Sequence, residues 1–226
     1  MSLILNIDTA SEKAHVSFAN DGKILHFISS ESQKEHASFL QTAIVQLTEI
    51  TDVKLSDIDA VAITAGPGSY TGLRVGMASA KGLCYAFKKP LITIGTLELL
   101  TLSALRLLPV DDESILFCPM IDARRMEVFT ALYKNDLTFY LAPCAMILDE
   151  SSFEKELSKN IIRFFGTGSE KFKAICTHQN ATFENVIILP ESMSNHSEMM
   201  YYQKKFTDLA YSEPFYLKEF QTVIKK

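Results

Sequence analysis

The sequence predicts an α/β protein built from two similar lobes. Apolar runs typical of strands alternate with segments of helical 3/4 periodicity, and the same order of elements occurs twice along the chain. The length of 226 residues is about one and a half times that of a common domain. With 47% hydrophobic residues and only 9 Gly and 7 Pro, the composition excludes a disordered protein. We therefore expect one complete lobe and a trimmed second copy.

The first half of the chain opens with three predicted strands. Residues 3–7 are an apolar run that ends at Asp8. The runs 14–19 and 23–28 flank Asp21-Gly22, and this dipeptide is typical of hairpin turns because such turns need positive φ. The second and third strands are therefore expected to be antiparallel neighbours.

Helices and strands then alternate through the rest of the first half. A helix over residues 34–50, ending near Thr51, is indicated by one apolar stripe: Phe39, Leu40, Ala43, Ile44, Leu47 and Ile50. The elements expected after it are a strand over 58–64, a glycine-rich loop over 65–72, a helix over 73–87, a strand over 91–94, and a helix over 96–107 with Thr96 as N-cap.

The second half repeats this order with shorter elements. We expect strands over 115–120 (ending at Asp122), 128–133 and 138–143, a helix over 152–157, a strand over 161–165, a loop over 166–169, a helix over 170–177, a strand over 186–189 and a helix over 197–209. The polar segment 109–114 places the boundary between an N-terminal lobe, 1–110, and a smaller C-terminal lobe, 111–226. Two β-β-β-α-β-α lobes with mixed sheets are the plan of the actin, Hsp70 and sugar-kinase fold, here with a trimmed second lobe.

Charge and cysteine content limit the classes of partner and compartment. The net charge of −5 disfavours unaided tight binding to nucleic acid, which normally uses a surplus of basic residues. The four cysteines form no C-x-x-C pair and are expected to be buried thiols in a reducing cytosol. No stretch reaches the ~18 apolar residues of a membrane span, and the N-terminus lacks the basic start of a signal peptide. The sequence thus predicts a cytoplasmic protein without a membrane partner.

The glycine-rich loop is the most distinctive local pattern. A strand, a glycine turn and a helix together can present backbone N–H groups to an anion. This loop, however, has Thr71 where G-x-G-x-x-G needs its third glycine, and no lysine in the Walker A position. The alternative interpretation is a tight structural turn, with glycine supplying positive φ and Pro67 supplying rigidity.

The continuous string from Gly66 to Gly76 resembles the hallmark of the TsaB (YeaZ) family. It comprises Gly66, Pro67, Gly68, Ser69, Tyr70, Thr71, Gly72, Leu73, Arg74, Val75 and Gly76. Three further strings resemble the same family in order: residues 4–10, residues 121–124 followed by 127–129, and residues 213–217, after which Lys218 replaces the usual arginine.

The resemblance implies a role in forming threonylcarbamoyladenosine beside the tRNA anticodon. It implies a non-catalytic subunit that docks on a TsaD-like catalytic subunit and activates it for threonylcarbamoyl transfer. A TsaE-like ATPase would join the complex, the chain would form a homodimer when alone, and tRNA would be bound only through the complex. No catalytic, cofactor or metal site is expected in this chain, because ATP and metal are expected on the partner subunits.

Two carboxylates and two arginines remain as candidates within the chain. Asp8 and Asp122 end equivalent strands, where they could face a metal-bound nucleotide or simply cap a local turn. Arg124 and Arg125 could bind RNA phosphate or pair with neighbouring acids such as Glu127, and on an acidic chain we favour the second. The alternative functions are a small-molecule kinase or ATPase of the actin-like fold, which would use the two aspartates, and a peptidase.

The helices over 34–50 and 73–87 are the expected contact with a partner. The second of them is small and apolar over much of its circumference, so it needs covering on more than one side. The resemblance implies that TsaB proteins pair through these two helices. The interface residues we predict are Phe39, Leu40, Met77, Ala80, Lys81 and Cys84.

Overall fold

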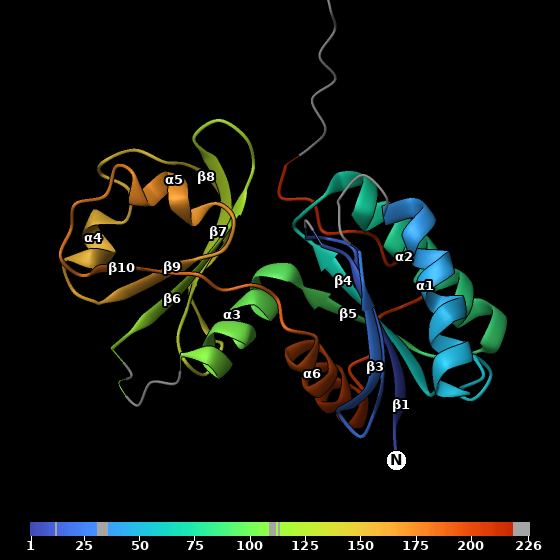
Figure 1. Cartoon of the computed structure of the whole chain (residues 1–226). Coiled ribbons are helices and arrows are strands. Elements are labelled where there is room, and N and C mark those ends of the chain that lie inside the picture. Colours follow the sequence, from blue (N-terminus) through green and yellow to red (C-terminus); the bar gives the residue numbers. More distant parts are fainter. Residues whose placement is uncertain (12, 31–35, 109–111, 113, 219–226) are drawn as a thin grey trace, which may run out of the picture.

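Two five-stranded sheets stand side by side with helices between them and around them (Figure 1). The computed structural model describes residues 1–11, 13–30, 36–108, 112 and 114–218. The predicted boundary at residue 110 lies outside these residues, as does most of the polar segment around it. Among the described residues, no helix combines the length and apolar character needed to cross a membrane.

The first sheet has the strand order β3-β2-β1-β4-β5. Its strands are β1 (Leu3–Asp8), β2 (His15–Asn20), β3 (Lys23–Ser29), β4 (Ala60–Gly66) and β5 (Leu91–Gly95). β1 pairs antiparallel with β2 and parallel with β4, so the sheet is mixed. Asp21 and Gly22 both have positive φ, which confirms the predicted hairpin between β2 and β3.

The second sheet repeats this topology strand for strand. Its order, β8-β7-β6-β9-β10, is built from β6 (Leu116–Asp122), β7 (Glu127–Tyr133), β8 (Phe139–Ile147), β9 (Ile162–Phe165) and β10 (Ala181–Glu184). β6 takes the place of β1, pairing antiparallel with β7 and parallel with β9. The predicted duplication of mixed sheets is therefore confirmed.

The helices differ in length between the lobes. The first lobe carries α1 (His36–Thr51), α2 (Tyr70–Phe87) and α3 (Thr96–Leu107), and the second carries α4 (Glu154–Leu157), α5 (Ser169–Lys173) and α6 (Pro190–Tyr202). α1 and α2 cover the outer face of the first sheet, while α3 and α6 lie between the two sheets (Figure 1). α4 and α5 are only 4 and 5 residues long, which agrees with a trimmed second lobe.

The two helices between the sheets join the lobes into one packed unit. α3 packs Leu97, Leu100 and Ala104 against the second sheet, and its Leu99 against the first. α6 comes from the C-terminal half of the sequence but packs Met193 on Ile4 and other residues of the first sheet. Each predicted lobe therefore contributes to the core of the other, while the boundary at residue 110 stays a prediction.

Two predicted elements were placed wrongly, the strand over 186–189 and the helix over 197–209. Residues 186–189 are not a strand, because Val186 and Ile188 pack against the α3 cluster instead, and β10 lies earlier in the chain. α6 begins at Pro190, where proline is tolerated in a first turn. Its buried face is rich in Ser and His, so hydrophobic periodicity does not reveal its first two turns.

The first turns of two other helices also differ from prediction. α2 begins at Tyr70 rather than at residue 73, because the Ser69 side chain accepts a hydrogen bond from the Gly72 N–H and caps the helix there. In α3, Gly95 rather than Thr96 occupies the N-cap position. The hydroxyl of Thr96 is buried without a hydrogen-bond partner.

Candidate functional site

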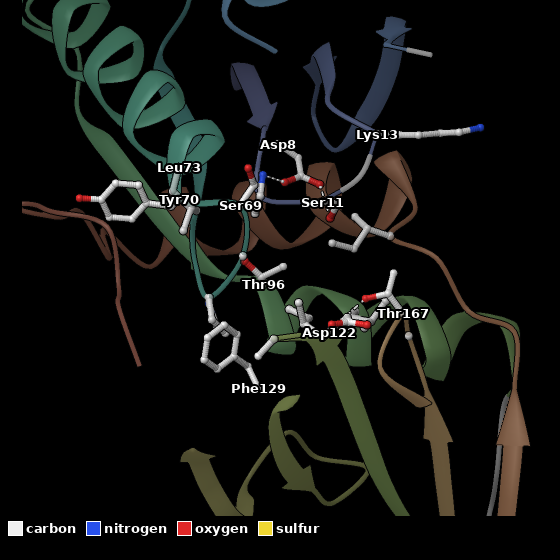
Figure 2. A pocket seen from close by; sticks show the side chains of 18 of the residues that line it. Asp8, Ser11, Lys13, Ser69, Tyr70, Leu73, Thr96, Asp122, Phe129 and Thr167 are labelled. Carbon is white, nitrogen blue, oxygen red and sulfur yellow. Dashed lines mark hydrogen bonds between the residues drawn. The ribbon is translucent and has the colours of Figure 1, made fainter. Parts of the chain in front are cut away.

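A cleft of about 2050 Å³ opens between the two lobes. Figure 2 shows Asp8, Ser11 and Ser69 on its first-lobe side, with Asp122, Phe129 and Thr167 facing them from the second lobe. Thr96, at the start of α3, lies between the two walls. Both predicted aspartates therefore line one cavity.

Asp8 ends β1 and is fully buried. Its Oδ1 accepts hydrogen bonds from the Thr64 hydroxyl at 2.6 Å and from the Ala10 N–H at 2.9 Å. Its Oδ2 accepts one from the Ser11 hydroxyl at 3.3 Å. A carboxylate with these partners serves mainly to fix the turn after β1, which agrees with the turn-capping interpretation.

His15, at the start of β2, is the strand partner of Asp8 and was missed by the sequence analysis. Its Nδ1 lies 3.7 Å from Asp8 Oδ2, while its buried Nε2 has no hydrogen-bond partner among the residues that the structure describes. Burial lowers the pKa of His15 below its usual value, and the nearby carboxylates of Asp8 and Glu191 only partly oppose this. The ring is therefore a neutral group in the wall of the cleft.

Asp122 occupies the position equivalent to Asp8 but is exposed. Partial burial acts to raise its pKa, but hydrogen bonds from the Lys171 ammonium at 2.8 Å and from the Arg124 N–H at 2.6 Å outweigh this and hold the pKa below its usual value. The Thr167 hydroxyl accepts a hydrogen bond from the Asp122 N–H at 3.1 Å. Like Asp8, this carboxylate stabilises local turns.

The glycine-rich string is explained by close backbone approaches. Gly66 has φ +116°, and a Cβ there would lie 2.6 Å from the Phe215 carbonyl oxygen, so no other residue fits. Gly76 faces inward from α2, where a Cβ would collide with the Thr9 hydroxyl and lie 2.9 Å from Ile63. The peptide bond between Gly66 and Pro67 is cis. These contacts favour the structural-turn interpretation of the loop.

Residues 206–218, which we call the strap, return from the end of α6 to the first lobe. The Thr207 N–H donates to the Leu91 carbonyl at 2.8 Å, beside the edge of β5. The Phe215 N–H donates to the Ala65 carbonyl at 2.7 Å, next to Gly66. The family-like string 213–217 is therefore the partner of the glycine-rich string.

An arginine and two tyrosines join the strap to the first turn of α2. The Arg74 guanidinium lies 4.1 Å from the centre of the Tyr70 ring and donates from Nε to the Tyr216 hydroxyl at 3.1 Å. The two rings lie 5.4 Å apart. This cluster borders the cleft, and the separation of 142 positions between Arg74 and Tyr216 hid it from local sequence patterns.

The strap ends against the second lobe. Lys218 donates to both carboxylate oxygens of Glu127 at 2.9 Å. The expectation that Arg124 and Arg125 pair with Glu127 is therefore wrong, because Lys218 occupies that carboxylate. In the described part of the chain, the side chains of these two arginines have no ion pair, and both line the cleft.

Four of the six predicted interface residues lie in the core of the first lobe. Leu40, Met77, Ala80 and Cys84 are at most 3% exposed. Burial raises the pKa of the Cys84 thiol to about 11. The apolar stripe that predicted them faces the sheet, so these side chains are unavailable to a partner.

The other two predicted interface residues also have contacts within the chain. Phe39 is half-buried against the same core. Lys81 donates to the strap carbonyls of Ala210 and Ser212 at 3.2 and 2.9 Å. Its ammonium therefore holds the strap against α2.

Comparison with known proteins identifies relatives of this chain. The family model described as TsaD, tRNA N6-adenosine threonylcarbamoyltransferase, matches residues 26–212. The chain is 34% identical to the Escherichia coli K12 tRNA threonylcarbamoyladenosine biosynthesis protein TsaB, over 59% of this chain and 55% of that protein. The alignment thus spans about half the length of this curated relative.

Solved structures support the predicted fold. A Pseudomonas aeruginosa protein described as similar to peptidase YeaZ has a TM-score of 0.82 at 22% identity, covering 96% of this chain and 100% of that chain. A polyphosphate/ATP-glucomannokinase from Arthrobacter has a TM-score of 0.50 at 11% identity, covering 90% and 100%. At these identities the likeness concerns the fold alone, and it confirms the actin-like class.

Proposed function

Given that this chain belongs to the TsaB (YeaZ) family and matches the TsaD family model, we propose that it is a subunit of the assembly that forms threonylcarbamoyladenosine in tRNA. In this role it docks on a TsaD-like catalytic subunit and activates threonylcarbamoyl transfer to the adenosine beside the anticodon. The observation that carries the proposal is the family match over residues 26–212, which includes both long helices and the glycine-rich string.

The outer faces of α1 and α2 are the docking surface in this proposal. Val45 on α1 is 55% exposed and Tyr85 on α2 is 82% exposed, although both are large hydrophobic side chains. Between them in sequence, Gly82 has open space where a Cβ would stand. Exposed apolar side chains together with a glycine such as Gly82, which stands three residues before Tyr85 on α2, permit close approach of a partner helix. This surface replaces the buried residues predicted from the sequence.

Reconstituted transfer tests the activating role. A TsaD-like subunit from the same cell would be mixed with threonylcarbamoyl-adenylate and tRNA, with and without this chain, and modified adenosine would be quantified. We expect transfer to require the chain, and the chain alone to produce none. Full transfer by the TsaD-like subunit in the absence of this chain would overturn the proposal.

A variant at Gly82 tests the docking surface. Gly82→Arg places a long charged side chain on the exposed face, so binding to the TsaD-like subunit should fall at least about tenfold, or ~1.4 kcal/mol. Gly82→Ala is the matched control and should bind as the wild type does, because its Cβ meets nothing within 4 Å. Unchanged binding by Gly82→Arg would place the interface elsewhere.

The finer parts of the proposal concern further partners. A TsaE-like ATPase joins the complex, the free chain forms a homodimer through the same helices, and the assembly works in the cytoplasm. Light scattering of Gly82→Arg measures self-association, and the binding assay measures docking on the TsaD-like subunit. If both contacts use the same helices, the variant should lose both.

The kinase or ATPase alternative is less favoured by the cleft. A catalytic aspartate must reach a metal-bound nucleotide, but Asp8 is fully buried and its oxygens accept hydrogen bonds from Thr64, Ala10 and Ser11. Calorimetry with ATP and Mg²⁺ would test this alternative directly. Micromolar binding by the isolated chain would revive it.

A further inference from the structure

The walls of the cleft are positively charged although the chain is acidic. Among the described residues that line the cleft, the basic ones are Lys13, Arg74, Arg124, Arg125 and Lys218, and the acidic ones are Asp8, Asp122 and Glu127. The whole chain carries a net charge of −5. The net charge of the cleft lining is therefore positive, opposite in sign to the net charge of the whole chain. Such a local field attracts anions.

The three acidic groups are already engaged, whereas three guanidinium groups have no carboxylate partner among the described residues, although Arg74 contacts Tyr70 and Tyr216. Asp8 is held by its turn, Asp122 by Lys171, and Glu127 by Lys218. Arg74, Arg124 and Arg125 have no carboxylate partner in the part of the chain that the structure describes. Since a guanidinium presents a planar fork of donors that matches a phosphate, these groups form a phosphate-binding set.

The backbone holds Arg124 and Arg125 at the cleft in an unusual way. Both have positive φ, +71° and +49°, in the hairpin between β6 and β7. Glycine and asparagine adopt positive φ readily, and arginine does so only rarely. The turn therefore carries two charged residues against local backbone preference, and both of them line the cleft.

Aromatic rings line the same cleft, and the Tyr216 ring contacts Arg74. Tyr216 is 38% exposed and Phe215 is 47% exposed on the strap, and Phe27 is 46% exposed at the edge of the first sheet. Phe129 faces the cleft from β7 (Figure 2). Exposed rings next to basic side chains are the elements of single-stranded nucleic-acid binding, in which bases stack on rings and cations hold phosphates.

From this arrangement we infer that the cleft binds a single-stranded segment of RNA. Arg124 and Arg125 hold phosphates from the second lobe, Arg74 holds one from the first, and the rings of Phe129 and Tyr216 stack on bases. The rings favour a nucleic acid over an acidic peptide, which would need the cations alone. The choice of RNA rests on the proposed function, whose substrate is tRNA.

Binding of a fluorescein-labelled single-stranded RNA to the purified full chain tests the inference. Fluorescence anisotropy should show saturable binding at about 50 mM salt. Three phosphate contacts predict a loss of roughly twentyfold in affinity at about 200 mM salt. Absence of saturable binding at low salt would overturn the inference.

A double variant removes the two charges without damaging the turn. Arg124→Asn with Arg125→Gly installs residues that tolerate the positive φ of both positions, and it should weaken RNA binding roughly tenfold and reduce the salt dependence. Lys204→Asn with Lys205→Ala is the matched control, because these two adjacent lysines are exposed and lie outside the cleft. An equal loss in the control pair would mean non-specific attraction and contradict the site.

Two further measurements distinguish this inference from a general polyanion-binding surface and from the proposed function. Polyglutamate should compete poorly with the RNA, and displacement at equal charge concentration would indicate a general polyanion surface instead. Reconstituted transfer is read in parallel with RNA binding by the isolated chain. A chain that activates the TsaD-like subunit but binds no RNA would refute the cleft site alone, and a chain that binds RNA but is dispensable for transfer would refute the proposed function alone.

Discussion

The two lobes have the same sheet but very different cover. Both sheets follow one strand order, and a glycine of positive φ ends β4 (Gly66) and directly follows β9 (Gly166). The first lobe is covered by α1 and α2, of 16 and 18 residues, and the second by α4 and α5, of 4 and 5 residues. Since the short helices suffice for the second sheet, α1 and α2 are longer than cover requires. In the proposed function, their outer faces are the surface on which the partner docks.

Aromatic rings replace helix length in the second lobe. Phe164 on β9 packs against Phe153, Phe172 and Phe183. The centres of neighbouring rings in this cluster lie 4.9 to 5.5 Å apart in four pairs. The core of the first lobe, by contrast, is mostly aliphatic, with Leu, Ile and Val from the sheet and the two helices. Four predictions use this contrast, beginning with the largest effect.

The Phe cluster should be the most sensitive part of the second lobe. Phe164→Ala removes a fully buried ring that touches three others, so the free energy of unfolding should fall by about 3–5 kcal/mol. Urea unfolding measures this loss, and Phe164→Leu should lose clearly less. A loss below about 1.5 kcal/mol would show that α4 and α5, and not the Phe cluster, provide most of the stabilising burial of the second sheet.

The inner and outer faces of α2 should respond oppositely to the same substitution. Gly76→Ala places a methyl group against Thr9 and Ile63, which should destabilise the protein by about 1–3 kcal/mol. Gly82→Ala meets open space and should stabilise the helix by about 0.5–1 kcal/mol. Thermal and urea unfolding of the two variants measure the change in the free energy of unfolding. A change of the same sign in both would contradict the assignment of Gly76 to the inner face and Gly82 to the outer face of α2.

Replacing His15 in the first lobe by valine, the residue at the equivalent position in the second lobe, should change how stability depends on pH. His15 pairs with Asp8 as Val128 pairs with Asp122. Burial lowers the pKa of folded His15 below the unfolded value of 6.5. As the pH falls, the unfolded chain therefore takes up a proton at His15 before the folded protein does. Stability from this group is thus present above pH 6.5 and is lost as the pH falls towards the folded pKa.

His15→Val should remove that part of the acid sensitivity. Between about pH 7.5 and pH 5.5, the free energy of unfolding should fall more in the wild type than in the variant. Identical slopes for His15→Val and the wild type would show that folding does not lower the pKa of His15.

The contact between the strap and the second lobe should have the smallest effect. Lys218→Ala breaks an exposed ion pair with Glu127, and such pairs contribute about 0.2–1 kcal/mol. A double-mutant cycle with Glu127→Gln measures the pair itself, and its coupling should weaken in high salt. Coupling above about 2 kcal/mol would instead mean that the strap is a main tie between the lobes.

Local patterns predicted the elements of this fold well. The strands that end at Asp8 and Asp122 and the hairpin at Asp21-Gly22 depend on residues close in sequence, so they can be recognised directly. α6 was misplaced because its buried face includes Ser192, Ser194 and Ser197, whose polar side chains hide helical periodicity. Tertiary packing decided that element.

The candidate site was predicted only in part, because its contacts join distant residues. Asp8, Asp122 and the glycine-rich string were found, but the partners of that string lie about 140 residues away in the strap. Periodicity located the apolar stripe of α2 correctly, yet that stripe faces the core, as Ala80 shows. The resemblance of residues 213–217 to a family string was the one signal that the strap is important.

The return of α6 and the strap to the first sheet has a consequence for biosynthesis. When a ribosome has completed the first lobe's own strands, the face that carries Ile4, Ala62 and Ile92 still awaits Met193, and Gly66 still awaits Phe215. The nascent chain must therefore leave an apolar surface uncovered by its native partners until Met193 and Phe215 have left the exit tunnel. For this protein, the half that is made first is the half that is finished last.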